Sequence, residues 1–438
     1  MPKTSISKFR EAVYQKVIWR PAAILDLVDA LTIAGHVNSP VTLSESPLFR
    51  RKFSSVYDAL VHGELSDDLK DLFNDSQDTG WETMAGYEIH AIDATPNERM
   101  AAETLADRGA LKARQKEPVR YGHKYSWLVR LVQSGTSWVA PEDIERIGTA
   151  ITDTKVAAQQ VKGLAVRNQH LKVITADSRY RDKHFLGVFA GLADTYALVR
   201  LQNNQVLSQE PVPKPKGSRG APRKHGVDFQ LTDIGRDPDA SEEFYLGKQK
   251  VRVRVWHKLH FKRLAKVVGS VVCVEFLKED NTPRYKRPLW LFWTGPEDVA
   301  PQDLCRMYLW RFAIEHLFRF LKQHMGLNSN RSSNLANLQR WMWIVALAYW
   351  QLLLMRDTVQ PNRPAWHPHK KDGQVKPLTP AQVQRSAQVF LLQSGTPAAN
   401  PRPAGKGCGR QTGYHPAPRK RYEIVFKTKK AQNQPNIC

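Results

Sequence analysis

The feature that most constrains the fold is an alternation of strand and helix patterns that begins at residue 87. Residues 87–93 alternate apolar and polar positions and end on Asp93, and residues 171–177 form a short apolar run that ends on Asp177. Between them, residues 124–133 and 137–140 predict two further strands. Pro141 and the acidic residues after it predict a helix that begins there and runs to about residue 169.

A helix over about residues 182–192 and a strand over residues 195–201 continue this pattern. Three strands, a helix, a strand, a helix and a strand are the order of an RNase H-like, or retroviral-integrase-like, α/β core. Open α/β sheets place their chemistry at the carboxyl ends of strands. We therefore expect Asp93 and Asp177 to lie together at one edge of the sheet.

Both aspartates also fit a structural role, because either side chain could cap the turn or helix that follows it. Other acidic residues could replace them in a site. The local substitutes are Glu98 and Glu103 for Asp93, and Asp182 and Asp194 for Asp177.

A third acidic residue, Glu315, stands in the sharpest local motif of the chain. On one continuous helix, Tyr308, Arg311 and Lys322 all fall within about 40° of Glu315, and Arg319 joins this polar stripe. Apolar residues fill much of the remaining circumference and can bury the helix. An ordinary salt-bridged helix face would show the same pattern, so both interpretations stand at this point.

Three carboxylates suit phosphodiester chemistry. Magnesium takes hard oxygen ligands and keeps several waters, so one or two carboxylates per ion suffice. Two ions about 4 Å apart can share a carboxylate, activate the attacking oxygen and stabilise the leaving one. Asp93, Asp177 and Glu315 are therefore predicted to be catalytic metal ligands for two Mg²⁺ ions, which Mn²⁺ can replace. Cations on the Glu315 stripe could hold substrate phosphates.

The spacing Y-x2-R-x3-E-x6-K, formed by Tyr308, Arg311, Glu315 and Lys322, resembles a signature of DDE transposases of bacterial insertion sequences. The resemblance is to the IS-four and related groups, and it covers roughly residues 40–356. It implies cleavage of transposon ends followed by transfer of the 3′-hydroxyl into target DNA. It also implies that the tyrosine, arginine and lysine contact DNA phosphates near the cleaved end.

Some proteins of these groups make a hairpin intermediate and stack a flipped base on an aromatic residue. The candidates in this chain are Trp256, Trp290 and Trp293, for which core packing is the alternative. The resemblance further implies a dimer on double-stranded DNA that carries terminal inverted repeats. We expect a bacterial cytoplasmic protein that is associated with the nucleoid.

The overall charge agrees with a polyanionic partner. The chain has 438 residues and a formal net charge of +23, which favours nucleic acid. The most apolar stretch, residues 341–355, would span roughly 22 Å as a helix, short of the ~30 Å membrane core. We therefore expect a buried core helix, and we see no signal peptide at the N-terminus. The 4 cysteines show no metal-binding or disulfide spacing, which favours reduced thiols.

Composition shifts predict five segments, given at the end of this paragraph. The first contains basic residues 50–52, which suit a DNA-binding module or, equally, a packing domain. Within the third, residues 247–288 carry 12 Lys and Arg against 3 acidic residues, so its sheet could lie along phosphates. The segments are a helical N-terminal domain (1–85), the first part of the core (86–202), a basic β-rich insertion (203–288), the end of the core (289–356) and a basic Pro-rich tail (357–438).

Alternatives to an active transposase remain open. An RNase H-like nuclease without strand transfer would need the same three acids. A catalytically silent, transposase-derived protein would only bind DNA. In the tail, Trp366–His369 with Cys408 and His415 could suggest a metal site, but the spacing fits a solvated Pro-rich segment better.

Overall fold

The computed structural model describes residues 5–77, 80–111, 118–212, 221, 223–233, 235–360, 377–402, 409 and 411–426. Within this range Cys273 and Cys305 are free and buried, as expected for reduced thiols. Several predictions fall outside the described residues. These are the middle of the basic loop (213–220), Trp366–His369, Cys408 and Cys438.

The predicted helical character of the N-terminal segment is confirmed. Its helices pack around α9, which is buried on all sides and also contacts β6. A helix that is apolar around its whole circumference belongs in a protein core, and none of the described helices is long and apolar enough to cross a membrane. The elements are α1 (Ser5–Lys16), β1 (Val17–Trp19), α2 (Pro21–Ile33), η1 (Pro40–Glu45), α3 (Ser54–His62), β2 (Glu64–Leu65), α4 (Leu69–Asp75) and α9 (Leu335–Met355).

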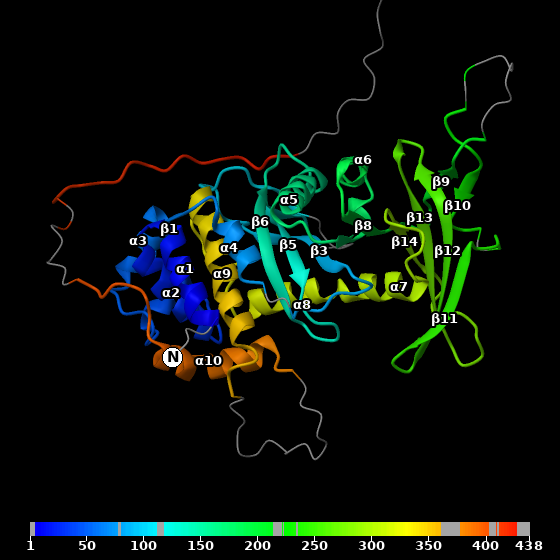
Figure 1. The fold of residues 1–438 in the computed structure, drawn as a ribbon. Helices are drawn as coiled ribbons and strands as arrows, with labels where there is room; N and C mark the ends of the chain where they lie inside the picture. Colours follow the sequence, from blue (N-terminus) through cyan, green and yellow to red (C-terminus); the bar gives the residue numbers. More distant parts are fainter. Residues whose placement is uncertain are drawn as a thin grey trace, which may run out of the picture.

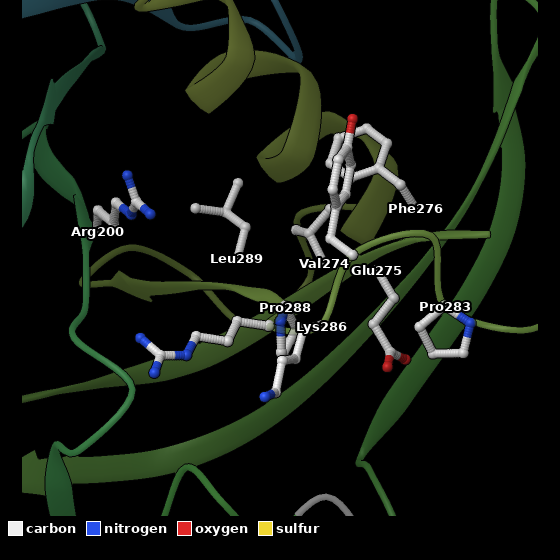
Figure 2. A pocket seen from close by; sticks show the side chains of 10 residues that line it. Arg200, Val274, Glu275, Phe276, Pro283, Lys286, Pro288 and Leu289 are labelled. Atoms are coloured by element: carbon white, nitrogen blue, oxygen red, sulfur yellow. The ribbon is translucent and has the colours of Figure 1, made fainter.

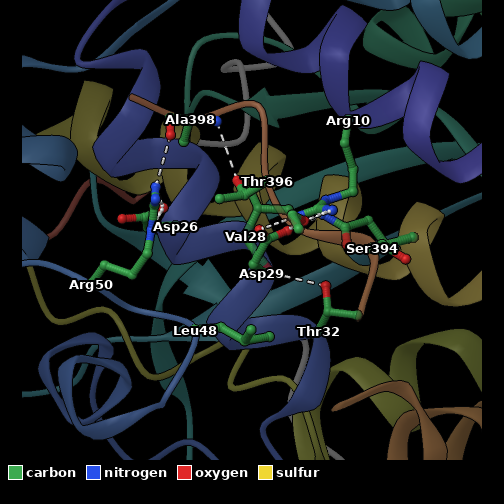
Figure 3. A network of polar contacts seen from close by, with 12 residues as sticks. Arg10, Asp26, Val28, Asp29, Thr32, Leu48, Arg50, Ser394, Thr396 and Ala398 are labelled. Carbon is green, nitrogen blue, oxygen red and sulfur yellow. Dashed lines mark hydrogen bonds and ion pairs between the residues drawn. The ribbon is translucent and has the colours of Figure 1, made fainter. Parts of the chain in front are cut away.

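Buried charges tie this helical region to a C-terminal segment (Figure 3). Arg10 pairs with Asp29, and its Nη1 donates to the carbonyl oxygen of Gly395 at 2.6 Å. Arg50 pairs with Asp26 at 2.8 Å and donates to the carbonyl oxygen of Ala398 at 3.1 Å. Since Arg50 makes internal contacts, the structure favours the packing interpretation of residues 50–52.

A twelve-stranded mixed sheet is the centre of the rest of the molecule (Figure 1). Its path is β10-β9-β12-β13-β14-β8-β7-β3-β5-β4, with β11 on β12 and β6 on β5. Among the described strands, β7 pairs in parallel with β3 and β8, and the other pairs are antiparallel. The strands are β3 (Glu88–Glu98), β4 (Gly109–Leu111), β5 (Arg120–Leu131), β6 (Val139–Ile147), β7 (Lys172–Ala176), β8 (Thr195–Arg200), β9 (Val206–Gln209), β10 (Asp228–Gln230), β11 (Ala240–Leu246), β12 (Gln249–Phe261), β13 (Leu264–Leu277) and β14 (Leu289–Trp293).

Helices cover both faces of this sheet and create two apolar cores (Figure 1). On one face, α5 (Asp153–Arg167) and α6 (Lys183–Leu186) pack on Ile92, Leu128 and Ile174. On the other, α7 (Pro301–Trp310) and α8 (Ala313–Gln323) join α9 in one core with Ala91, Trp127 and Val129. The change of face between neighbouring residues follows the two-residue period of a strand.

The prediction that a helix begins at Pro141 is wrong in its starting residue. Residues 139–147 form β6, and the helix begins only at Asp153, where the Thr152 side chain accepts a hydrogen bond from the Lys155 N–H. Proline is tolerated because, among the described strands, β6 pairs only with β5, and the ladder shifts register between Leu128 and Val129, next to Pro141. The acidic residues after Pro141 are satisfied by tertiary ion pairs rather than by a helix terminus.

The strands of residues 203–288 continue the same sheet, since β13 pairs with β14 and β14 pairs with β8. The alternating cations of β12 do not form the free basic face expected for this segment. Arg252 pairs with Glu243 at 2.7 Å, and Arg254 pairs with Glu275 at 2.9 Å. Acidic residues on the neighbouring strands β11 and β13 therefore neutralise these positions.

The expectation of a purely extended tail after residue 357 is also wrong. Residues 380–394 form α10 (Pro380–Ser394), which has a Thr379–Gln382 capping box and buries Val383, Ala387 and Leu391 at helical spacing. Farther on, Val425 bridges Gly109 of β4. Tertiary contacts therefore order parts of a segment whose composition indicated none.

Candidate active site

Strand register brings Asp93 and Asp177 to one place. In the parallel ladder of β3 and β7 the last pair is Ile92 with Ala176, so Asp93 is the next residue of β3 and Asp177 directly follows β7. Strand alternation directs both side chains to the face covered by α7 and α8. The prediction that β3 ends at Asp93 is wrong, because β3 continues to Glu98 against β5. The parallel pairing of β3 with β7 therefore ends just before Asp93, whereas β3 itself continues to Glu98.

The two aspartates form an electrostatically strained pair. Burial and the charge of Asp177 raise the pKa of Asp93 to about 6. The Arg311 guanidinium and the Ala94 N–H, which donates to Asp93 at 2.8 Å, offset only part of that rise. Asp177 accepts a hydrogen bond from the Arg179 N–H at 2.8 Å. Two neighbouring carboxylates of this kind favour a bound cation.

The helix that carries Glu315 is divided, which corrects the expectation of one continuous helix. α7 ends at Trp310 and α8 begins at Ala313. In the intervening turn, the Arg311 N–H donates to the carbonyl oxygen of Tyr308 at 3.1 Å. This bond spans three residues, as in a 3₁₀-helix, rather than the four of an α-helix. The break occurs where the chain passes from packing on β11 and β12 to packing on β3 and β6.

Arg311 lies between the first and third acidic residues. Its guanidinium is 3.6 Å from the Asp93 carboxylate and 3.1 Å from that of Glu315. It also lies over the Tyr308 ring, 5.6 Å from the centroid. Burial would lower the pKa of Arg311, but Tyr308 and the two carboxylates raise it, so its charge is retained. The guanidinium thus provides the positive charge between these two carboxylates.

The donor set fits a hard divalent cation in its chemistry, because all three residues offer carboxylate oxygens. The geometry fits less fully. Among the described residues, no group of three or more His, Cys, Asp or Glu side chains is placed to hold a metal ion. Asp93 and Asp177 are neighbours, whereas Glu315 is engaged by Arg311. Glu315 is therefore held by a cation rather than placed with the two aspartates.

The remaining predicted DNA contacts lie in different surroundings. Tyr308 is buried, and burial raises its pKa. Burial lowers the pKa of Lys322, while the charges of Glu98 and Asp93 act in the opposite direction, which places Lys322 near the acids. Arg319 is exposed and lines a small cavity beside α10, with no ion pair to any of the three acids. The structure therefore brings Tyr308 and Arg311 into contact, whereas neither Lys322 nor Arg319 forms an ion pair with any of the three acids.

The substitute acids have other partners. Asp182 caps α6 by accepting the Phe185 N–H at 2.9 Å, and Glu98 pairs with Arg120 at 2.9 Å. Glu103 pairs with Arg421 of the C-terminal segment. Asp194 precedes β8 and so lies at the opposite end of the strands from Asp177. None of these four lies beside the Asp93–Asp177 pair in the strand register.

Arg200 is a neighbour of the site that the sequence analysis did not single out. It follows Val199, the partner of Ala176, and therefore reaches the same edge as Asp177. Arg200 and Lys286 line a cavity of about 160 Å³ from different segments (Figure 2). The apolar strand that ends at Arg200 was a usable signal, because parallel strands end at a common edge.

The three tryptophans considered for base stacking are core residues. Trp256, Trp290 and Trp293 are at most 5% exposed, and the Trp256 indole N–H donates to a backbone carbonyl oxygen. They cannot offer a free ring face to a flipped base. The exposed ring at the cavity beside Arg200 is that of Tyr285.

Comparison with known families bears on this arrangement. Residues 149–351 match the family model described as a transposase DDE domain. This match supports a DDE transposase. The matched range contains Asp177 and the whole Tyr308–Lys322 motif, and it begins after Asp93. A search of curated proteins found no match.

Proposed function

We propose that this protein is a DNA transposase of the IS-four-like group with the Y-R-E-K motif. Its activity would be to cut the ends of an insertion sequence and join them to target DNA. The observation that carries this proposal is the pairing of Asp93 with Asp177 at the end of the parallel ladder, with Glu315 linked to Asp93 through Arg311. The match of residues 149–351 to a transposase DDE domain supports the same conclusion.

In this proposal Asp93, Asp177 and Glu315 hold two Mg²⁺ ions, or Mn²⁺ in their place. When bound, such ions activate the attacking oxygen and stabilise the leaving one. Asp93 has to lose its proton to serve as a ligand, which the raised pKa makes harder below pH 6. Arg311, Tyr308 and Lys322 hold the phosphates next to the cut, and a phosphate that takes over Arg311 would free Glu315.

The proposal extends to the architecture. The strand order β6-β5-β3-β7-β8, with α5 and α6 on one face, supports an RNase H-like core. We propose residues 203–288 as its insertion and 1–85 as the helical N-terminal domain. Holding two DNA ends together requires at least two protomers, so we expect a dimer on double-stranded DNA. We place this activity in the bacterial cytoplasm, at the nucleoid.

The test is cleavage of labelled DNA that carries the element's own ends, in magnesium or in EDTA. The Glu315→Gln protein should bind this DNA nearly as well as wild type but should not cut it, because the change removes a metal ligand and no cation. Glu297→Gln, at an exposed loop position, is the matched control and should cut normally. Full cleavage by Glu315→Gln would contradict the proposal.

Two other results would redirect the assignment. Magnesium-dependent nicking that ignores the element's ends would indicate an RNase H-like nuclease without strand transfer. Binding without any cut, in manganese as well as magnesium, would indicate a catalytically silent DNA-binding descendant.

A further inference from the structure

A basic cleft of about 840 Å³ lies between α6 and the turn that joins β12 to β13. These segments are far apart in the sequence and line the same cleft. The lining contains a single acidic residue, Asp182. Its basic residues are Arg179, Arg181, Lys183, His184, Lys262 and Arg263.

Much of the positive charge in this cleft is not neutralised. Arg181, Lys183 and Arg263 form no ion pair with any carboxylate in the part of the chain that the structure describes. Asp182 cannot compensate them fully, because it brings one negative charge against three cations, and its oxygens already cap α6 and accept the Thr154 hydroxyl at 2.8 Å. The cleft therefore differs from β12, where Glu243 and Glu275 neutralise the arginines.

One of these cations is held in place by neutral groups. The Arg181 guanidinium donates to the side-chain oxygens of Gln205 at 3.1 Å and Gln202 at 2.7 Å. These bonds orient the guanidinium without cancelling its charge. Its remaining hydrogen-bonding capacity and its full charge are available to an anion.

The cleft adjoins the proposed catalytic acids. Arg179, which lines it, stands two residues after Asp177 and donates its backbone N–H to that aspartate at 2.8 Å. The cleft lies on the α5–α6 side of the sheet, whereas Arg311 belongs to the α7–α8 side. The cleft thus adjoins Asp177 from the α5–α6 side of the sheet, whereas Arg311 pairs with Asp93 from the α7–α8 side.

We propose that this cleft binds the backbone of a second DNA duplex, the one into which the cut ends are joined. The inference rests on the proposed function, because joining requires two DNA segments to be held at one site. Cations that contact phosphates position a duplex and carry no base information. A cleft of this kind suits DNA of arbitrary sequence, because its cations can contact phosphates without reading bases.

The test uses the full-length protein with Arg181 and Arg263 both changed to Gln. The first probe is a labelled random-sequence duplex that lacks the element's ends, measured by fluorescence anisotropy over a range of salt concentrations. The affinity should fall at least about tenfold, and the slope of log K against log salt should become shallower by about two. A double variant with Lys162→Gln and Arg385→Gln, both exposed helix positions, matches the charge change and should resemble wild type.

The second probe separates the two DNA segments. End cleavage and the joining of pre-cut ends to a plasmid are measured with the same proteins. The Arg181/Arg263 variant should cut ends normally and lose joining. Normal joining and normal binding of the random duplex would overturn the inference while leaving the proposed function intact. Loss of end cleavage together with end binding would also overturn it, because the cleft would then hold the element's end.

Failure of the proposed function gives a different pattern. If wild type cuts no DNA in magnesium or manganese, the transposase proposal fails. Weaker binding of the random duplex by the Arg181/Arg263 variant would still support the cleft as a DNA surface. Unchanged binding of the random duplex would contradict the role of the cleft as a DNA surface as well.

Discussion

The two strand-borne aspartates and the helix-borne Glu315 reach the candidate active site by different physical means. Backbone register sets the positions of Asp93 and Asp177, because both directly follow the last pair of a parallel ladder. The position of Glu315 depends on side-chain partners, and its carboxylate pairs with Arg311 at 3.1 Å. Two of the proposed ligands are therefore preorganised, and the third depends on what else binds Arg311.

The largest expected effect comes from removing one acid of each kind. Asp177→Asn and Glu315→Gln should each slow end cleavage by at least about 1000-fold, or about 4 kcal/mol in activation free energy. Mn²⁺ binding without DNA, measured by electron paramagnetic resonance, should separate the two variants. Asp177→Asn should abolish binding, whereas Glu315→Gln should change the affinity less than about threefold. Equal losses of Mn²⁺ affinity in both variants would contradict the proposed difference between the strand-borne and the helix-borne ligands.

The strain within the aspartate pair predicts an effect on stability. The folded-state pKa of Asp93 is about 6, above its ordinary 3.8, so the folded protein holds this proton more tightly than the unfolded chain. The free energy of unfolding therefore falls as pH rises from 3.8 to about 6. Asp93→Asn removes this penalty and should stabilise the metal-free protein by about 2 kcal/mol at pH 8.

Urea unfolding at pH 8 and at pH 4 measures this effect. The gain should nearly vanish at pH 4, where the aspartate penalty is mostly absent. Asp194→Asn, at an exposed position before β8, is the control and should show no comparable pH-dependent gain. A destabilised Asp93→Asn protein at pH 8 would mean that its contacts with Ala94 and Arg311 outweigh burial and repulsion.

The smallest expected effect concerns Arg311 itself. Arg311→Gln removes the cation between Asp93 and Glu315, so the Mn²⁺ affinity of the DNA-free protein should rise by about threefold to tenfold, or ~1 kcal/mol. Arg306→Gln, which removes an α7 cation that lies 3.9 Å from Asp303, is the matched control and should leave the affinity unchanged. A lower affinity in Arg311→Gln would show that the arginine positions the ligands rather than competing with the metal.

Local patterns predicted those parts of the fold in which one signal dominates. The apolar run before Asp177 became β7, and the apolar stretch 341–355 became most of the buried helix α9. The helix start predicted at Pro141 is wrong because the local preference of proline for a helix start competes with a bulged strand pairing to β5. α10 was missed because its three buried positions lie in a segment whose overall composition is polar and Pro-rich.

The sequence by itself determined which acids could share a site and which residues accompany Glu315. Strand periodicity and helical spacing are local properties of the chain, and parallel strands place their carboxyl ends together. Only the tertiary structure decided that Asp93 lies within a longer strand, that Arg311 holds Glu315 and that α6 meets the β12–β13 turn in a basic cleft. These outcomes depend on contacts between segments far apart in the chain, whose free energies no local pattern encodes.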